Sequence, residues 1–327
     1  MIAVPPRTPP RADSTVMSPI RPLIGIASAR RPAILAETLD YLAGLYGKDV
    51  PIIVCVPSPE DAAGIAATAG VEIVTGPEGL TRQRNAILQA AIGRADLVLF
   101  FDDDFIPHPD FVTQMQRVFA REPDVVIATG RVLFDGILTR GFTLAQSVGF
   151  LVHPPRQTGR LRPVHNAYGC NMAVRLSIVA RHHLAFDERL PLYGWLEDVD
   201  FSRVMARHGK SVHVDDAWGV HMGVRSGRQP GLRLGYSQVA NPAYLAAKGT
   251  LSLPRAMLQI ARNTLANIAG CLRGETGIDR RGRLCGNLLA FRDLCLGRAD
   301  PGRVLDLQTG PRPPGGAIDA LRKRSMP

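Results

Sequence analysis

The chain has 327 residues, of which 46% are hydrophobic and 21% charged, as in an ordinary globular protein that can bury a sizeable core. Its formal net charge of +10 suggests an anionic partner, whether nucleic acid, a phosphorylated small molecule or an acidic membrane surface. No apolar run is long enough to span a membrane, and residues 1–19 lack the apolar core of a signal peptide. We therefore expect a soluble or peripheral protein.

The first part of the chain alternates short apolar runs with segments of helical composition. Residues 1–19 are rich in proline and in basic and small polar residues, which predicts a disordered tail. The expected strands are 22–28, 51–56, 71–75 and 96–101. The expected helices are 33–46, 59–69 and 81–93, the last capped by Thr81. This alternation predicts an α/β fold, a doubly wound and mostly parallel sheet with helices on both faces.

The second part is less regular. We expect loops or an irregular insertion from Arg131 to Arg162, because the periodicity weakens there and Gly, Pro and Arg increase. Three more helices are expected: one over 110–121, one that begins at about 176, and one that follows the pattern 186–201 and ends near 208. Extended segments are expected at 125–128, 171–174, 211–214 and 220–222. Ser252 could cap an amphipathic helix over 253–272, and a second such helix is expected over 283–296.

Five cysteines are present, and no two of them form a Cys-x-x-Cys pair. This pattern favours reduced thiols in a cytoplasmic protein over a disulfide framework or a zinc site. The cysteines are Cys55, Cys170, Cys271, Cys285 and Cys295.

Three consecutive carboxylates, Asp102, Asp103 and Asp104, follow the apolar run 97–101. Such a run predicts a buried strand, and open α/β sheets bind ligands at the carboxyl ends of their strands. Asp102 and Asp104 can converge on one Mg²⁺ or Mn²⁺ ion, which would take its other ligands from a diphosphate and water. This suits a nucleotide-linked substrate whose leaving group is a diphosphate. The alternative is a solvated acidic turn.

A second acidic site is formed by Glu197 and Asp198, which follow an aromatic, Gly-containing loop and open a helix. The functional interpretation is a general base that takes a proton from an acceptor hydroxyl. Tyr193 and Trp195 could then stack on a sugar ring. The alternative is stabilisation of a helix N-terminus by acids in its first turn.

Several cationic residues are candidates for binding an anionic ligand. His221 lies in a separate extended segment, and it is either a metal ligand or an ordinary surface or core histidine. Arg225, four residues further on, could hold a phosphate group. Arg82 and Arg84 open the helix before the acidic strand and could face the same anion, or belong to a solvated helix face.

Four segments, taken in order, resemble the inverting nucleotide-sugar transferases of glycosyltransferase family 2, which have the GT-A fold. They are residues 79–85 (GLTRQRN), 100–104 (FFDDD), 171–175 (NMAVR) and 194–201 (GWLEDVDF). The resemblance implies that Asp102 and Asp104 hold the nucleotide diphosphate through a metal, with Asp103 as a further donor contact. It also implies that Asp198 is the base, that Glu197 assists acceptor binding, and that His221 completes the metal shell.

The same resemblance implies an activity and its partners. The enzyme would be a hexosyltransferase that moves one sugar from a nucleotide-diphosphate sugar to a glycan or lipid-linked acceptor. It would act in bacterial cell-surface polysaccharide (exopolysaccharide) synthesis. It would not bind nucleic acid. Many family members carry an Asp at the end of the second strand, where this chain has 54–58 (VCVPS), so the nucleobase contact is open. The chain also lacks the Gln-x-x-Arg-Trp box of processive synthases, which favours a single addition.

Two other functions compete with this one. A sugar nucleotidyltransferase would also use Asp-bound Mg²⁺, but it usually carries a Gly-rich loop after the first strand, where Arg30 and Arg31 stand here without glycines. A non-enzymatic basic protein that binds membrane surfaces would explain the charge. It would not explain why three acids end a buried strand.

The expected organisation has three parts. Residues 1–19 form the tail, and residues 20–250 the GT-A catalytic domain, with a nucleotide-sugar half to about 130 and an acceptor half after it. Residues 251–327 form a helical extension with a flexible end. The amphipathic helix 253–272 either packs on the catalytic domain or lies at the inner surface of the cell membrane as an interfacial helix.

Overall fold

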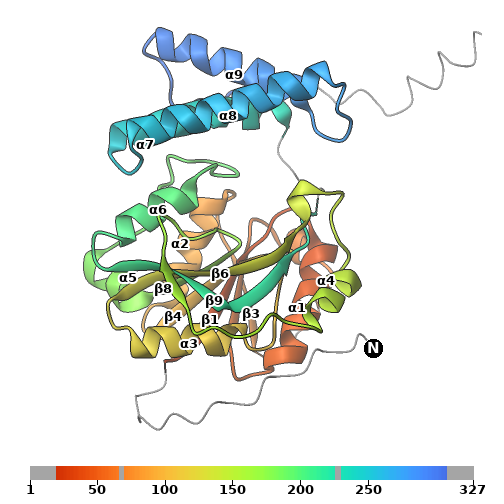
Figure 1. The fold of residues 1–327 in the computed structure, drawn as a ribbon, viewed down its shortest axis with the longest axis vertical. Helices are drawn as coiled ribbons and strands as arrows, with labels where there is room; N and C mark the ends of the chain where they lie inside the picture. Colours follow the sequence, from red (N-terminus) through yellow and green to blue (C-terminus); the bar gives the residue numbers. More distant parts are fainter. Residues whose placement is uncertain (1–19, 66–69, 225–229, 308–327) are drawn as a thin grey trace, which may run out of the picture.

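The computed structural model describes residues 20–65, 70–224 and 230–307. The expected tail, residues 1–19, and the expected flexible end from 308 lie outside these ranges. The described chain forms a sheet flanked by helices, with a separate layer of three helices, α7 to α9, packed above it (Figure 1). No helix in the described ranges is long and apolar enough to cross a membrane.

The sheet is mixed, with its N-terminal half parallel. Its strand order is β3-β2-β1-β4-β8-β6-β9-β5, and β7 pairs with β9. β8 runs antiparallel between β4 and β6, whereas β6 and β9 are parallel. The strands are β1 (Pro22–Ala27), β2 (Ile52–Val56), β3 (Val71–Thr75), β4 (Leu97–Asp102), β5 (Phe105–Pro107), β6 (Val125–Asp135), β7 (Leu161–Pro163), β8 (Asn171–Arg175) and β9 (Lys210–His221).

Helices cover both faces of the sheet, as the sequence predicted. Strand β4 shows why: its side chains alternate, so Leu99 and Phe101 join one core and Val98 and Phe100 the other. The first core contains residues of α1, α3 and α4, and the second contains residues of α2, α5 and α6. The helices are α1 (Pro32–Tyr46), α2 (Leu80–Ala91), α3 (Phe111–Arg121), α4 (Leu144–Leu151), α5 (Leu176–His182) and α6 (Glu197–Met205).

Some elements are longer or more regular than the sequence indicated. β6 continues to Asp135 rather than ending at 128, and β9 is one strand rather than two short ones. The register of β6 against β9 jumps between Val214 and Trp218, and this bulge absorbs the polar residues that interrupt the apolar pattern of β9. The expected insertion 131–162 contains a helix, α4, which a Thr143–Gln146 capping box begins.

Two local predictions are wrong. The helix expected over 59–69 is only a 3₁₀ turn, Pro59–Ala62, in the part that the structure describes, and residues 66–69 lie outside it. Thr81 does not cap α2, because Gly79 occupies the N-cap position with φ +128°. Instead, the hydroxyl of Thr81 donates to the carbonyl of Leu190 at 3.2 Å and so fastens α2 to a distant loop.

The helical layer contains one helix that the sequence did not predict. α7 (Gly231–Lys248) precedes α8 (Leu253–Leu272) and α9 (Arg280–Cys295), packs against both, and carries Pro242 in its interior. Proline usually interrupts a helix, so Pro242 hides the helical pattern of this segment. α7 therefore packs with the two helices that follow it, although the sequence analysis assigned residues 231–250 to the expected GT-A domain. Lys248 of α7 ties this layer to the part of the molecule below it by ion pairs with Asp187 (2.6 Å) and Asp200 (2.7 Å).

Candidate active site

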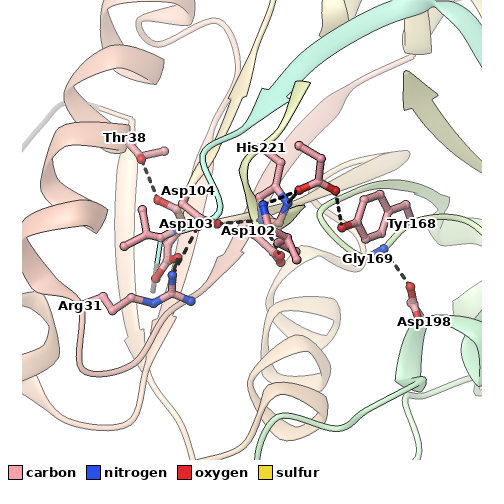
Figure 2. Close-up of polar contacts among 12 residues, drawn as sticks. Arg31, Thr38, Asp102, Asp103, Asp104, Tyr168, Gly169, Asp198 and His221 are labelled. Atoms are coloured by element: carbon pink, nitrogen blue, oxygen red, sulfur yellow. Dashed lines mark hydrogen bonds and ion pairs between the residues drawn. The ribbon is translucent and has the colours of Figure 1, made fainter. Parts of the chain in front are cut away.

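Acidic side chains gather around His221 at one edge of the sheet (Figure 2). Nε2 of His221 lies 3.2 Å from Oδ1 of Asp104 and 3.9 Å from Oδ2 of Asp102, and Nδ1 lies 3.1 Å from Oδ1 of Asp135. We call these four residues the His221 cluster. Asp102, Asp104 and His221 have ligand atoms that all lie within 4.8 Å of one another. These are the three residues that the sequence proposed as metal ligands.

The sheet topology brings this cluster together. Asp102 is the last residue of β4, and His221 and Asp135 end β9 and β6, which pair in parallel register at those two residues. The carboxyl ends of these strands therefore meet at the same edge. Asp104 is held there by β9, because the N–H of Met222 donates to its carbonyl and the N–H of Val224 to its carboxylate.

The charges of the His221 cluster suit a cation. Burial lowers the pKa of His221, but its hydrogen bonds to Asp104 and Asp135 outweigh burial and raise that pKa to about 10. Burial raises the pKa of Asp104, yet the bond to His221 brings it below its usual value. The protonated imidazole supplies positive charge to Asp104 and Asp135, and a divalent cation bound here would replace that proton. Two carboxylates and one neutral imidazole form a donor set that fits Mn²⁺, and Mg²⁺ somewhat less well because of the nitrogen.

Asp103 points away from the His221 cluster. Its Oδ2 accepts a hydrogen bond of 2.5 Å from the hydroxyl of Ser28, and its Oδ1 lies 3.2 Å from Nη1 of Arg31. Arg31 also reaches Asp104 at 3.5 Å. Burial raises the pKa of Asp103 to about 7, against the charge of Arg31. Asp103 therefore holds the loop and positions Arg31, while its neighbours face the cluster (Figure 2).

Arg84 connects the His221 cluster with the second acidic site. Its side chain is buried, and its guanidinium donates to Glu197 at 2.6 Å, to the carbonyl of Gly169 at 2.8 Å and to Asp102 at 3.3 Å. It also lies against the rings of two phenylalanines. Arg84, which the sequence proposed as a ligand contact, is thus surrounded by protein groups and orders carboxylates of both sites.

Glu197 and Asp198 differ in their surroundings. Burial raises the pKa of Glu197 well above its usual range, against the charge of Arg84. Its Oε2 is buried and has no hydrogen-bond partner among the described residues. Asp198 is half-buried, and it accepts N–H bonds from Gly169 at 3.1 Å and from Val199 at 2.8 Å. Burial raises the pKa of Asp198 as well, although Arg84 and these bonds oppose it.

The remaining candidates lie in the loop before α6, on the surface of α2 or outside the described ranges. The rings of Tyr193 and Trp195 lie 6.3 Å apart in the loop before α6, and Tyr193 is exposed. Arg82 lies on the surface and pairs with Glu188 at 3.5 Å. Arg225 lies outside the described residues, so the phosphate contact proposed for it keeps the status of a prediction.

Two residues of the site were not recognised from the sequence. Asp135 was missed because β6 was expected to stop at 128, so no acid was placed beside His221. Arg31 was noted only as part of the loop after β1, yet it supplies the charge next to Asp103 and Asp104. An extended β6 would have revealed Asp135, since it pairs with His221 in the sheet register. The hydroxyl of Tyr168 also donates to Asp135, at 3.1 Å.

Residues 24–182 match the model of the family "Glycosyl transferase family 2". This segment is a glycosyltransferase domain. It contains β1 to β8 and therefore Asp102, Asp104 and Asp135, whereas Asp198 and His221 lie beyond it. No curated protein matches the sequence of the chain.

Several solved glycosyltransferase structures are similar to this chain at low sequence identity, and those of TarS reach a TM-score of 0.50. Residues 1–349 of S. aureus TarS are 10% identical, with 87% of this chain and 82% of that chain covered and a TM-score of 0.50, and the complex of TarS with UDP-GlcNAc also scores 0.50. The mannosyltransferase PcManGT from Pyrobaculum calidifontis, in complex with GDP-Man and Mn²⁺, is 11% identical (95% and 83% covered, TM-score 0.48). GalNAc-T7 with UDP, GalNAc and Mn²⁺ is 13% identical (73% and 52%, TM-score 0.48), so this chain spans about half its length. The fold is of the GT-A type.

Proposed function

We propose that the protein is a metal-dependent inverting glycosyltransferase that moves one sugar from a nucleotide-diphosphate sugar to an acceptor hydroxyl. The observation that carries this proposal is the separation of two acidic sites at one edge of the sheet. The His221 cluster suits a cation, and Asp198 lies apart from it, beyond Gly169 (Figure 2). An inverting transfer needs such a division, because the base and the leaving group act on opposite sides of the sugar.

The His221 cluster would hold the donor through its diphosphate. The proposed ligands are Asp102, Asp104 and His221. Asp135 would orient the imidazole of His221 by accepting a hydrogen bond from its Nδ1–H. A divalent cation bound there would neutralise the charge that develops on the leaving diphosphate. Arg31 adds a fixed positive charge beside Asp104, and it is positioned by Asp103.

Asp198 would act as the base. It takes the proton of the acceptor hydroxyl, and the oxygen then attacks the anomeric carbon. The N–H groups of Gly169 and Val199 hold the carboxylate in place. A raised pKa favours this role, because a stronger base takes the proton more readily while it remains ionised near neutral pH. Glu197 Oε2, which is buried without a partner in the described part of the chain, is free to bind a hydroxyl of the acceptor.

A cavity next to the start of α6 supports an acceptor site in this region. It has a volume of about 200 Å³ and lies between the catalytic domain and α8. Leu196 and Val199, which flank Asp198 closely in sequence, line it together with His165 and Arg255. Nε2 of His165 is buried without a hydrogen-bond partner among the described residues. Apolar walls with an arginine and an unsatisfied imidazole suit an acceptor that has both a hydrocarbon part and an anionic group.

This chemistry favours a lipid-linked acceptor over a free glycan. Such an acceptor is typical of cell-surface polysaccharide synthesis, and it would bring the enzyme to the cytoplasmic face of a membrane. The five cysteines, none of them in a disulfide, agree with a reducing compartment. The nucleobase of the donor has no acidic partner at the end of β2, where Cys55 is buried and Val56 precedes Pro57.

A thermal-shift screen of nucleoside diphosphates and nucleotide-sugars, each with and without Mn²⁺, tests this function. We expect one nucleotide to stabilise the protein only when Mn²⁺ is present, by about 2.7 kcal/mol at a ligand concentration about a hundred times its Kd. The matching nucleotide-sugar should release a nucleoside diphosphate on turnover. Release of pyrophosphate from a nucleoside triphosphate, or stabilisation that ignores Mn²⁺, would contradict the proposal.

A further inference from the structure

The outer face of α8 exposes an unusual number of large apolar side chains. Six of them have between 38% and 84% of their surface exposed, and they recur at helical spacing along one side. They are Leu253, Met257, Leu258, Leu265, Ile268 and Leu272. The helix has 20 residues and is therefore about 30 Å long. A face of this length and composition is a surface that a partner normally covers.

The inner face of α8 combines two small residues, Ala256 and Gly270, with a buried side-chain amide, that of Asn267. Asn267 is fully buried, and its amide donates to Gln238 of α7 at 2.9 Å and to Asn287 of α9 at 2.8 Å. Arg280 in turn donates to the side-chain oxygen Oδ1 of Asn267 at 3.2 Å. Buried hydrogen bonds of this kind fix the rotation of α8 about its axis, because turning the apolar face inward would leave all these groups unpaired.

The charges of α8 have one sign. Its sequence contains no Asp or Glu, and Arg255 and Arg262 are exposed, as is Arg273 directly after its last residue. At 100° per residue, these three arginines follow one another along one border of the apolar face. A second copy of α8 would bring the same three cations against this border. An anionic lipid surface would accept both the apolar face and the arginines.

We propose that α8 is an interfacial helix that seats the protein on an anionic membrane surface, with its apolar face in the headgroup region and its arginines on lipid phosphates. The proposal does not depend on sugar transfer, because membrane binding can be measured without turnover. It has one consequence for the proposed acceptor site. Arg255 and Leu258 of α8 also line the cavity next to the start of α6, so that cavity would open next to the lipid surface.

The test is sedimentation of the full-length protein with vesicles of phosphatidylcholine, prepared with and without phosphatidylglycerol. We expect binding to the anionic vesicles, and weaker binding when salt is added. Leu265→Gln with Leu272→Gln should weaken partitioning at least about tenfold, because both side chains lose their burial in lipid. The matched control is Ile73→Gln, an exposed apolar residue on β3 in the catalytic domain, which should leave binding unchanged.

The arginines are tested separately. Arg262→Gln and Arg273→Gln should each weaken binding to anionic vesicles about fivefold, the value for one basic residue near such a surface. Arg181→Gln, an exposed arginine of α5, is the control. Circular dichroism and thermal unfolding of every variant establish that it is folded. We expect all variants to fold, because the replaced side chains are exposed.

Two results would overturn the proposal. One is that the double variant Leu265→Gln with Leu272→Gln binds anionic vesicles within twofold of the wild type, or that the wild type does not bind them at all. The other is a wild-type dimer in sedimentation velocity without lipid that these substitutions convert into a monomer, since a second copy would then be the partner of the apolar face. A monomer that binds anionic vesicles through these residues supports it.

Discussion

The two acidic sites of this molecule contain similar residues in opposite electrostatic settings. In the His221 cluster, an imidazole holds the pKa of Asp104 below its usual value despite burial. In the Glu197–Asp198 pair, burial dominates, and it raises the pKa of both carboxyls even though Arg84 lies beside them. The first setting keeps charge available for a cation, and the second keeps a carboxyl able to accept a proton.

What separates the two sites is the location of positive charge. His221 is close enough to hydrogen-bond Asp104 and Asp135 directly, and Arg31 adds to it. The guanidinium of Arg84 donates hydrogen bonds to Glu197, to Asp102 and to a backbone carbonyl. It therefore links the two sites without fully neutralising the negative charge of either one. Carboxylates of the same type thus acquire different chemistry from their neighbours.

The largest expected effect comes from removing a proposed metal ligand of the His221 cluster. Asp104→Asn should lower Mn²⁺ affinity by more than about a hundredfold. Mutating a residue that only hydrogen-bonds a metal ligand lowers metal affinity by up to about a hundredfold, and losing a ligand itself should cost more. Electron paramagnetic resonance of free Mn²⁺ measures this affinity. Asp103→Asn is the matched control, because the side chain of Asp103 faces Ser28 and Arg31 instead, and it should change the affinity less than tenfold. Equal losses in the two variants would remove the distinction between these neighbours.

Arg84 is the next test, because it joins the two sites. Arg84→Met should destabilise the fold by about 3–5 kcal/mol, since Glu197 is left buried without its charge partner. Arg82→Met removes an exposed pair with Glu188, two residues earlier on the same helix, and should cost no more than about 1 kcal/mol. Urea unfolding of both variants provides the measurement. Similar stabilities would mean that the buried guanidinium does not couple the sites.

The pH dependence should resolve the two sites into separate acidic limbs. Asp198 must be ionised, so kcat should fall as pH decreases through its pKa, which burial raises above the ordinary value near 4. Metal binding requires neutral His221, so activity at limiting Mn²⁺ should also fall as pH decreases, because protons compete with the metal.

Turnover profiles at two Mn²⁺ concentrations distinguish these limbs. Added Mn²⁺ should move the His221 limb to lower pH and leave the Asp198 limb in place. A single limb that moves entirely with Mn²⁺ would argue against a separate base, and one that never moves would argue against His221 as a ligand.

Much of the catalytic fold could be predicted from local pattern. The apolar runs of β1, β2 and β4 and the helices α1 and α2 are short-range features, and the sequence located them within a few residues. Asp102 and Asp104 could be proposed because a buried strand leads directly into them. Their meeting with His221 depends on the pairing of β9 beside β6, which no local pattern determines.

The failures share a physical cause, which is tertiary structure overriding local preference. Pro242 lies inside α7 because packing against α8 and α9 outweighs the lost hydrogen bond. Thr81 is buried and bonds Leu190 instead of capping its helix. The amphipathic pattern of α8 gave the helix its correct bounds, but it could not reveal that Asn267 faces inward and the leucines outward.

The central claim, that Asp198 is the base and the His221 cluster holds the donor, is tested most directly by Asp198→Asn. Single-turnover kinetics with the donor found in the thermal-shift screen should show a loss of about 10³-fold in transfer rate. Mn²⁺-dependent nucleotide binding should stay within twofold of the wild type. Near-normal transfer by Asp198→Asn, with transfer abolished in Glu197→Gln, would contradict the account by moving the base to Glu197.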